Sequence, residues 1–183
     1  WLIKYFDKVT DTFGPGSVDS YAVIDGKIIA ANPWEGGGSF NFSQRAWYTD
    51  ALASAGEVVF SDVYTDSITG EPVITVSKAL QKAGDVFAMD VYLDNPALHI
   101  SASSLPESYS CYLFDSQGTL VYAITHWDVD RQTLQQFGDQ LMEGMQSGRL
   151  VAYDASFQDP DGVSRGAYAH EMSNGWSIIV TIP

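Results

Sequence analysis

The sequence has 183 residues, of which 45% are hydrophobic, and its formal net charge is -14. This length and apolar content predict one large or two small folded domains and argue against disorder. The acidic charge argues against nucleic acid as a partner, the single cysteine excludes an internal disulfide, and no apolar run is long enough to span a bilayer.

Apolar periodicity and turn residues divide the first half of the chain into helices and strands. Leu2, Phe6 and Val9 recur at helical spacing and no capping residue precedes them, so we expect the end of a longer N-terminal helix. The later predicted elements are a strand hairpin around Asp25-Gly26, a helix over 43–56 with Ser43 as its N-cap, and strands over 57–66, 73–80 and 83–93. Trp34 and the glycines that follow it predict a mobile flap before the second helix.

The second half of the chain repeats this order of elements. They are a hairpin around 116–118, a helix over 130–148, and strands over 149–157, 164–172 and 175–183. Four apolar residues of the helix are expected to face the core, namely Leu134, Phe137, Leu141 and Met145. Consecutive strands joined by turns indicate antiparallel sheets, so we predict an α+β fold of two similar modules, each a sheet flanked by helices.

One short stretch concentrates side chains that suit a binding pocket. The sequence RAWYTD places Arg45, Trp47 and Tyr48 within four residues, and Tyr64 follows sixteen residues later. Aromatic rings beside one cation and several carboxylates either pack a core or hold a small charged molecule. Asp90 stands between apolar residues in the strand VFAMDVYL, where a buried carboxylate is costly unless it has a partner.

Four successive segments, SYAVIDGKII, RAWYTDALA, FSDVYTDSITGEPVITVSKAL and GDVFAMDVYL, resemble the double Cache sensor domain of bacterial transmembrane receptors. The resemblance covers essentially the whole chain and implies two stacked PAS-like modules on one long N-terminal helix. Residues 1–13 would end that helix, 14–100 would form the membrane-distal, ligand-binding module, and 101–183 the membrane-proximal module. It also implies a membrane-anchored, homodimeric receptor with this domain on the extracytoplasmic side of the cell membrane.

In family members that bind free amino acids, the distal pocket takes residues from this helix and the next two strands. Carried over position by position, the resemblance implies a ligand-binding set of Arg45, Trp47, Tyr48, Tyr64, Asp66 and Asp90, with Phe40 where relatives usually have a tyrosine. A guanidinium matches a carboxylate in bidentate geometry, a carboxylate accepts hydrogen bonds from an ammonium, and aromatic rings enclose the ligand. We therefore expect the sensor domain of a chemoreceptor, histidine kinase or diguanylate cyclase that binds a small metabolite, above all an amino acid, without enzymatic activity, cofactor or metal.

Other interpretations of these residues stay open from the sequence. Asp50, two residues after Tyr48, favours a biogenic amine, and relatives also bind nucleobases or small carboxylates. A hydrolase using Asp62, Asp66 and Asp90 as acid and base is the alternative from another class.

Structural roles are also open to the same residues. The aromatic rings suit a core, Arg45 suits a surface ion pair, and Asp62 and Asp66 suit the capping of a turn. The segment 126–130 contains a single histidine, so it predicts a loop and a helix N-cap rather than a metal site.

Overall fold

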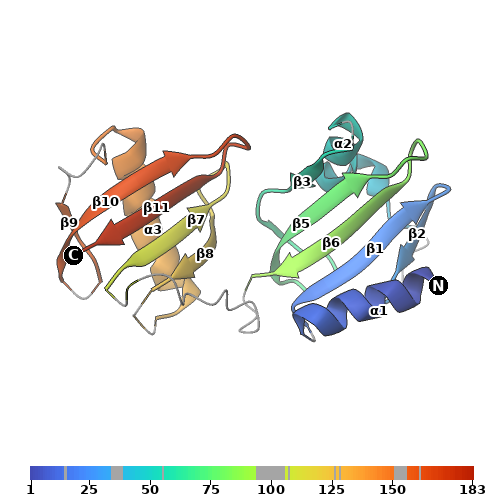
Figure 1. Ribbon diagram of the computed structural model, residues 1–183, viewed down its shortest axis with the longest axis horizontal. Helices are drawn as coiled ribbons and strands as arrows, with labels where there is room; N and C mark the ends of the chain where they lie inside the picture. The colour runs from blue at the N-terminus through green and yellow to red at the C-terminus, as the bar shows by residue number, and fades with distance from the viewer. Residues whose placement is uncertain are drawn as a thin grey trace. The chain divides into compact units, whose positions relative to one another are not determined.

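A computed structural model divides the chain into two units, residues 1–98 and 99–183, each built on one antiparallel sheet (Figure 1). It describes residues 1–14, 16–33, 39–54, 56–93, 106, 108–125, 127, 129–150, 156–160 and 162–183. The predicted α+β class is confirmed. Trp34 and His126 lie outside the described residues. None of the helices in the described ranges has the length and apolar character of a membrane span.

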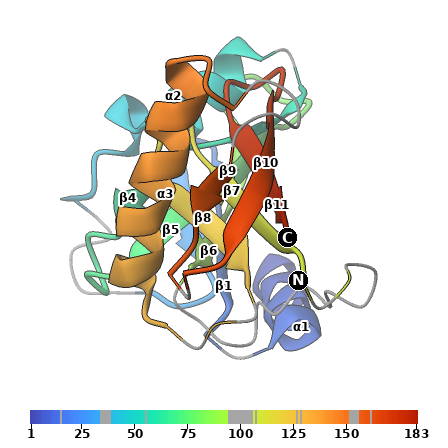
Figure 2. The ribbon, with the colours of Figure 1, turned by 90° about the vertical axis from the view of Figure 1, so that its left-hand side faces the viewer.

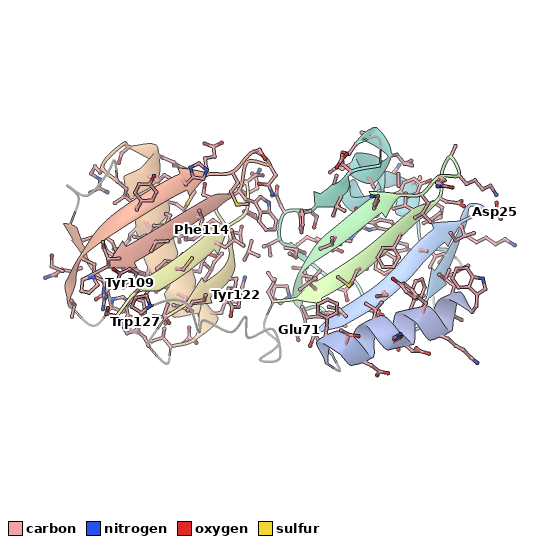
Figure 3. All side chains as sticks on the ribbon, in the orientation of Figure 1. Asp25, Glu71, Tyr109, Phe114, Tyr122 and Trp127 are labelled. Carbon is pink, nitrogen blue, oxygen red and sulfur yellow. The ribbon has the colours of Figure 1, made fainter. Side chains whose placement is uncertain are left out.

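The first unit follows the predicted order of helix, hairpin, helix and strands. Its elements are α1 (Leu2–Phe13), β1 (Val18–Ile24), β2 (Lys27–Ala30), the 3-10 helix η2 (Phe42–Gln44), α2 (Ala46–Ala53), β3 (Val58–Phe60), β4 (Tyr64–Thr65), β5 (Pro72–Ala79) and β6 (Val86–Tyr92). The strands are arranged in the order β2-β1-β6-β5-β3, and β4 pairs with β5. Asp25, at the tip of the first hairpin in Figure 3, and Gly26 have φ angles of 52° and 71°, as a type I′ turn requires. The predicted hairpin is therefore confirmed.

The sheet of the first unit lies between α1 and α2. Phe6 of α1 is fully buried, and its ring centroid lies 5.9 Å from that of Phe87 on β6. On the other face, the Ser77 hydroxyl donates a hydrogen bond of 2.7 Å to the Trp47 carbonyl of α2. Ser77 pairs with Ala88, the neighbour of Phe87, and consecutive strand residues point to opposite faces. The α2 face is the one that carries the candidate site.

The second unit has the same strand order as the first. Its elements are β7 (Ser110–Phe114), β8 (Leu120–Ile124), α3 (Arg131–Gln146), β9 (Ser156–Gln158), β10 (Ser164–Glu171) and β11 (Ser177–Ile182). The order β8-β7-β11-β10-β9 matches β2-β1-β6-β5-β3 element for element. The structure thus confirms that the hairpin, helix and three strands occur twice, with α3 against one face of the second sheet (Figure 2).

The inward face of α3 is as predicted. Phe137 and Leu141 are buried, and Leu134 and Met145 pack against the same core. Asp130 caps the helix, because its side chain accepts a hydrogen bond of 2.7 Å from the Thr133 amide. Tyr112 and Phe114 also lie in the core of this unit and Trp127 packs against it, and these rings contact one another or Phe137.

One local prediction is wrong in detail, and another falls mostly on residues 151–155, outside the described residues. Ser43 is not the N-cap of the second helix, because α2 begins at Ala46 and Arg45 takes the N-cap position with extended backbone. The Asn41 side chain instead accepts hydrogen bonds from the amide and hydroxyl of Ser43, which lies in η2. The strand predicted over 149–157 is limited, within the described residues, to Ser156–Gln158.

The strand predicted over 57–66 is in fact broken into β3 and β4. The Ser61 hydroxyl accepts a hydrogen bond of 2.8 Å from the Thr75 amide and donates to the Asp62 carbonyl. A side chain therefore replaces a backbone carbonyl at this point, and the regular ladder stops. The chain resumes pairing at Tyr64, opposite Val73.

Replacing Gly138 with alanine is predicted to destabilise the second unit. A Cβ at Gly138 would lie 2.6 Å from Cε1 and 2.9 Å from Cζ of the buried Phe114 ring. Overpacking of this kind costs about 1–3 kcal/mol, which exceeds the gain of about 1 kcal/mol in helix propensity. Urea unfolding should show the loss, with the exposed Gln140→Ala of α3 as control. A more stable Gly138→Ala protein would contradict the packing described.

Candidate functional site

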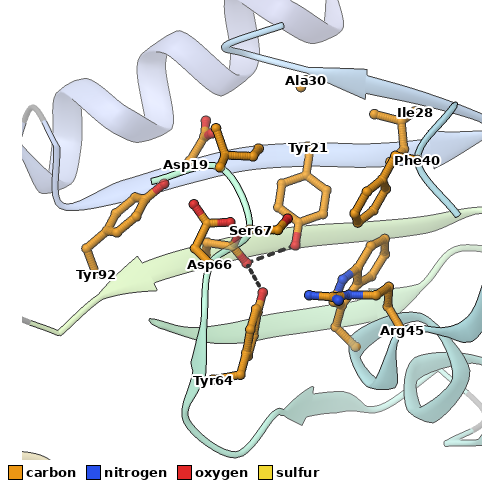
Figure 4. Close-up of a pocket in the computed structure, with 13 residues that line it drawn as sticks. Asp19, Tyr21, Ile28, Ala30, Phe40, Arg45, Tyr64, Asp66, Ser67 and Tyr92 are labelled. Carbon is orange, nitrogen blue, oxygen red and sulfur yellow. Dashed lines mark hydrogen bonds between the residues drawn. The ribbon is translucent and has the colours of Figure 1, made fainter. Parts of the chain in front are cut away.

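A pocket of about 460 Å³, including its opening, lies in the first unit on the α2 face of the sheet. Its lining combines charged, aromatic and aliphatic side chains from β1, β2, the start of α2, β4 and the following turn, and β6 (Figure 4). The lining residues are Asp19, Tyr21, Ile28, Ala30, Phe40, Arg45, Trp47, Tyr64, Asp66, Ser67, Ile68, Asp90 and Tyr92.

Asp90 on β6 is the centre of a hydrogen-bond network at the floor of this pocket. Its Oδ1 accepts from the hydroxyls of Thr75 at 2.7 Å, Tyr21 at 2.8 Å and Tyr64 at 3.2 Å. The hydroxyls of Tyr64 and Thr75 also lie 2.7 Å apart. The three hydrogen bonds to Asp90 all end on Oδ1, so Oδ2 accepts none from the described residues. The network fixes the carboxylate and leaves one oxygen for a ligand.

Asp90 is only 7% exposed, and burial raises the pKa of its carboxyl group to about 6, against the lowering effect of the bonds from Thr75 and Tyr21. Burial also raises the pKa of the Tyr64 hydroxyl, and the charge of Asp90 adds to this effect. Tyr64 therefore stays a protonated donor at neutral pH. Near pH 7 Asp90 is therefore mostly ionised, although it is nearly buried and forms no ion pair with a described residue.

Arg45 supplies the positive charge of the pocket. Its guanidinium carbon lies 5.4 Å from the ring centroid of Tyr64 and 5.6 Å from that of Phe40, within the range of cation–π attraction. The guanidinium forms no ion pair with a carboxylate among the described residues. Two rings therefore hold a cation whose donors remain available to a carboxylate.

Asp66 and Asp19 lie at the other end of the pocket from Arg45 (Figure 4). Asp66 is 6% exposed, and its Oδ2 accepts from the amide and hydroxyl of Thr69 at 2.9 and 2.8 Å. Asp19 is the cross-strand partner of Asp90, and the Asn32 amide donates a hydrogen bond of 3.0 Å to its Oδ1. Burial raises the pKa of Asp19, and the charge of Asp66 raises it further. The three carboxylates are thus close enough to interact.

The structure brings six of the seven predicted site residues to this pocket, namely Phe40, Arg45, Trp47, Tyr64, Asp66 and Asp90. Tyr48 is not in the lining, because its hydroxyl donates a hydrogen bond of 3.0 Å to the Gly84 carbonyl. Asp50 is exposed on α2, and neither it nor Asp62 lines the pocket. Asp66 combines the two roles considered for it, since it both caps a turn and faces the pocket.

Sequence reasoning missed seven lining residues, namely Asp19, Tyr21, Ile28, Ala30, Ser67, Ile68 and Tyr92. A signal was available for those on β1 and β6, because Asp19 and Tyr21, like Asp90 and Tyr92, are two residues apart and share one face of the sheet. Strand register was needed to place the two pairs together.

The second unit lacks this charged arrangement at equivalent positions. Equivalent positions are found by counting residues from the turn of the corresponding hairpin. Val86 and Ser177 are in the first pair after the β5–β6 and β10–β11 turns, and Asp90 and Thr181 each lie four residues further along their strands. The row Asp19–Asp90–Thr75 of the first sheet therefore corresponds to Ser110–Thr181–Ala167 in the second. No carboxylate occupies that row, so the two sheets share their topology and differ in their polar chemistry. Among the described residues, no cluster of side chains suits a metal ion.

Residues 3–95, just over half of the chain, match the family model described as the first PDC sensor domain of methyl-accepting chemotaxis protein-like receptors. The chain belongs to this family. The resemblance to Cache-type sensor domains drawn from the sequence is thereby confirmed. The region matched by the family model contains every residue of the pocket.

Relatives of this PDC family include bacterial chemoreceptors. The chain is 40% identical over 75 residues to the methyl-accepting chemotaxis protein TlpB of Bacillus subtilis, covering 40% of this chain and 11% of TlpB. It is 28% identical over 119 residues to McpC of the same organism, covering 61% of this chain and 18% of McpC. The chain thus spans less than a fifth of the length of these relatives.

Solved structures of chemoreceptor ligand-binding domains share the fold of this PDC family member. The ligand-binding domain of Campylobacter jejuni Tlp3 in complex with 4-methylisoleucine matches with a TM-score of 0.60 and 16% identity, covering 98% of this chain and 68% of that domain structure. The ligand-binding domain of Pseudomonas fluorescens CtaA in complex with L-alanine matches with a TM-score of 0.54 and 20% identity, covering 90% of this chain and 71% of that domain structure. At these identities the likeness establishes the fold.

The raised pKa of Asp90 predicts a pH-dependent stability in the absence of ligand. The pKa of Asp90 is 3.8 in the unfolded chain and about 6 in the folded chain, so folding takes up a proton between these two pH values. As the pH rises through this window, ionisation of Asp90 therefore lowers the free energy of unfolding. Asp90→Asn removes this effect. Relative to the wild type, its free energy of unfolding should therefore increase by roughly 3 kcal/mol between about pH 3.5 and about pH 7.5.

Urea unfolding at a series of pH values measures this difference, and Asp50→Asn serves as the control because Asp50 is exposed and outside the pocket. The free energies of unfolding of Asp90→Asn and the wild type could instead differ by the same amount at both ends of the pH range. That result would show that Asp90 is not buried as described.

Proposed function

We propose that the chain is the extracytoplasmic ligand-binding region of a membrane-anchored, homodimeric bacterial receptor, and that it binds a free amino acid in the pocket of its first unit without transforming it. The observation that carries this proposal is the pairing of Arg45, a guanidinium without an ion-pair partner among the described residues, with Asp90, a fixed carboxylate with an oxygen to spare.

The two groups are complementary to the two charges of an α-amino acid. The Arg45 guanidinium offers parallel N–H donors to the ligand carboxylate. Oδ2 of Asp90 accepts from the ligand ammonium, while Oδ1 is held by hydroxyl groups. The Tyr64 ring is within 5.4 Å of the guanidinium and its hydroxyl contacts Asp90, so one residue sets the spacing of both groups. Trp47 and Phe40 add aromatic surfaces to the lining.

Comparison with relatives supports an amino acid over other metabolites. Tlp3 and CtaA, which share the fold, were solved with 4-methylisoleucine and L-alanine. An amine ligand would leave the Arg45 guanidinium unmatched, and Asp50, on which the amine interpretation depended, lies outside the pocket. Of the three carboxylates considered for a hydrolase, Asp66 and Asp90 line the pocket and Asp62 lies outside it, so the turnover assay described below decides between the two functions. We assign residues 14–100 to the membrane-distal module and 101–183 to the membrane-proximal module.

The sheet offers a physical route from the pocket to α1. Asp90 and Phe87 lie on β6, three residues apart, and point to opposite faces. Asp90 is in the pocket, and Phe87 packs against Phe6 of α1. If a ligand binds more tightly when β6 occupies one of two positions, it increases the population of that position. Because Phe87 of β6 packs against α1, the packing of α1 changes with it. The output of the receptor would be read from that helix.

Arg45→Ala is predicted to weaken amino acid binding far more than it weakens the fold. A thermal-shift panel of free α-amino acids first identifies the ligand that raises the melting temperature most. For that ligand, isothermal titration should show a loss of about 2–5 kcal/mol in Arg45→Ala, which is more than tenfold in affinity. The decarboxylated amine of the same ligand should bind both proteins equally.

Tyr48→Phe is the matched control for this experiment, because it removes a hydrogen bond from α2 without touching the pocket lining. Unchanged amino acid affinity in a folded Arg45→Ala protein would exclude the assigned carboxylate contact. Turnover of any panel compound would exclude a purely sensory role.

Amino acid affinity is also predicted to depend on pH through Asp90. Its pKa of about 6 in the free protein means that acid protonates the group that accepts from the ligand ammonium. Affinity should therefore be constant above about pH 7 and fall by up to tenfold per pH unit below about pH 6. Asp90→Asn should bind weakly and lose this pH dependence. A wild-type affinity that is flat from about pH 5 to about pH 8 would rule out Asp90 as the ammonium contact.

A further inference from the structure

The wall of the pocket carries more negative charge than a neutral amino acid compensates. One guanidinium, from Arg45, and three carboxylates, from Asp19, Asp66 and Asp90, line it. When all four are ionised the wall has a formal charge of -2. A zwitterion with one ammonium and one carboxylate leaves that charge unchanged, in a pocket where Asp66 and Asp90 are only 6% and 7% exposed.

No cation of the described chain neutralises the three carboxylates. None of them forms an ion pair among the described residues, where the ion pairs found include Lys82 with Asp25 and Arg165 with Asp159. Asp19 and Asp90 are direct cross-strand partners, an arrangement in which like charges destabilise a sheet. The hydrogen bonds to Asp66 and Asp90 support a turn and the sheet, but the uncompensated charge of the cluster opposes fold stability.

Two of the buried carboxylates have an oxygen without a described hydrogen bond. The bonds to Asp66 end on Oδ2 and those to Asp90 end on Oδ1. In both residues one oxygen is fixed and the other remains available to a donor. Tyr92 lines the pocket beside them, and burial together with the charge of Asp66 raises the pKa of its hydroxyl.

The charges are also ordered along the pocket. Figure 4 shows Arg45 and Phe40 at one end, Tyr21 and Tyr64 in the middle, and Asp19, Asp66 and Tyr92 at the other end. Asp90 accepts hydrogen bonds from the two tyrosines in the middle. From the Arg45 end, a ligand therefore meets one positive group, then one carboxylate, then two more carboxylates.

We infer that this pocket selects an α-amino acid with a second cationic group on its side chain. Building on the proposed function, the α-carboxylate pairs with Arg45, the α-ammonium with Asp90, and the side-chain cation with Asp66 and Asp19. Such a ligand has a net charge of +1 and halves the formal charge of the wall. The ring of Tyr92 adds an aromatic surface next to the same group.

Two nearly isosteric amino acids test this inference. L-Ornithine and L-norleucine have side chains of the same length, and they differ in an ammonium in place of a methyl group at the end. Isothermal titration of the chain with each should show L-ornithine binding roughly tenfold tighter or more, as expected for one additional charge-assisted contact. The advantage should shrink at high salt.

Asp66→Asn and Asp19→Asn locate the effect. Each substitution keeps the acceptor that holds Thr69 or Asn32 and removes one charge. Both should lower the affinity for L-ornithine and leave that for L-norleucine nearly unchanged, so that the ratio of the two affinities falls toward one. Asp50→Asn removes a charge from the exposed face of α2 and should leave the ratio unchanged, which separates the local contact from net charge.

Each outcome bears on a definite statement. L-Norleucine binding as tightly as L-ornithine, or a ratio that survives both substitutions, overturns the side-chain assignment and leaves the amino acid site of Arg45 and Asp90 standing. Putrescine, which is ornithine without its carboxylate, binding tighter than L-ornithine overturns the role of Arg45 and with it the proposed function. Absence of binding by both amino acids overturns the side-chain assignment, and it overturns the proposed function as well if no α-amino acid of the thermal-shift panel binds.

Discussion

The arrangement of the first unit depends on how one buried carboxylate is held. Asp90 interrupts an apolar strand, and an ionised carboxylate in that position is tolerated only if donors surround it. Thr75, Tyr21 and Tyr64 supply those donors from three different strands. The same bonds that satisfy the carboxylate therefore tie β1, β4, β5 and β6 together beneath the pocket. Structure and binding chemistry share one set of atoms.

This dual use explains why the carboxylate is preorganised. The hydroxyl donors fix one oxygen and, because they are neutral, leave the charge uncompensated. A cationic donor in their place would have neutralised Asp90 and removed its attraction for a ligand. Arg45 lines the same pocket, yet the rings of Phe40 and Tyr64 hold its guanidinium separately. Opposite charges are thus kept in one pocket without collapsing into an internal ion pair.

Local sequence patterns were sufficient for most elements of the fold. The hairpin at Asp25-Gly26 requires a turn that few residue pairs form, and α3 shows its inward face in the spacing of Phe137 and Leu141. The break between β3 and β4 was not predictable. There the Ser61 hydroxyl, in place of the Ser61 carbonyl, accepts the hydrogen bond from the amide of Thr75, which lies fourteen residues further along the chain. Such a replacement leaves no trace in hydrophobic periodicity.

The candidate site was only partly readable for a similar reason. Arg45 and Trp47 lie in one of the segments that resemble the family and Tyr64 in the next, so a resemblance between sequences pointed to them. Asp19 and Tyr21 come from a strand about seventy residues before Asp90 along the chain, and only the register of β1 against β6 makes them neighbours. Tyr48 lies outside the lining because adjacent residues of a helix point about 100° apart, so Trp47 faces the pocket and Tyr48 does not.

The break at Ser61 gives part of the pocket wall a degree of independence from the sheet. The segment that contains Tyr64, Asp66 and Ile68 pairs only with the beginning of β5 and stands outside the main strand order. Its turn is closed by its own bonds between Thr69 and Asp66. The exposed residues Ser67 and Ile68 can therefore be exchanged by mutation without disturbing the strands beneath them, whereas any change at Asp90 alters the floor of the pocket and the sheet together. New ligand preferences would arise more readily in this turn than on the strands of the sheet.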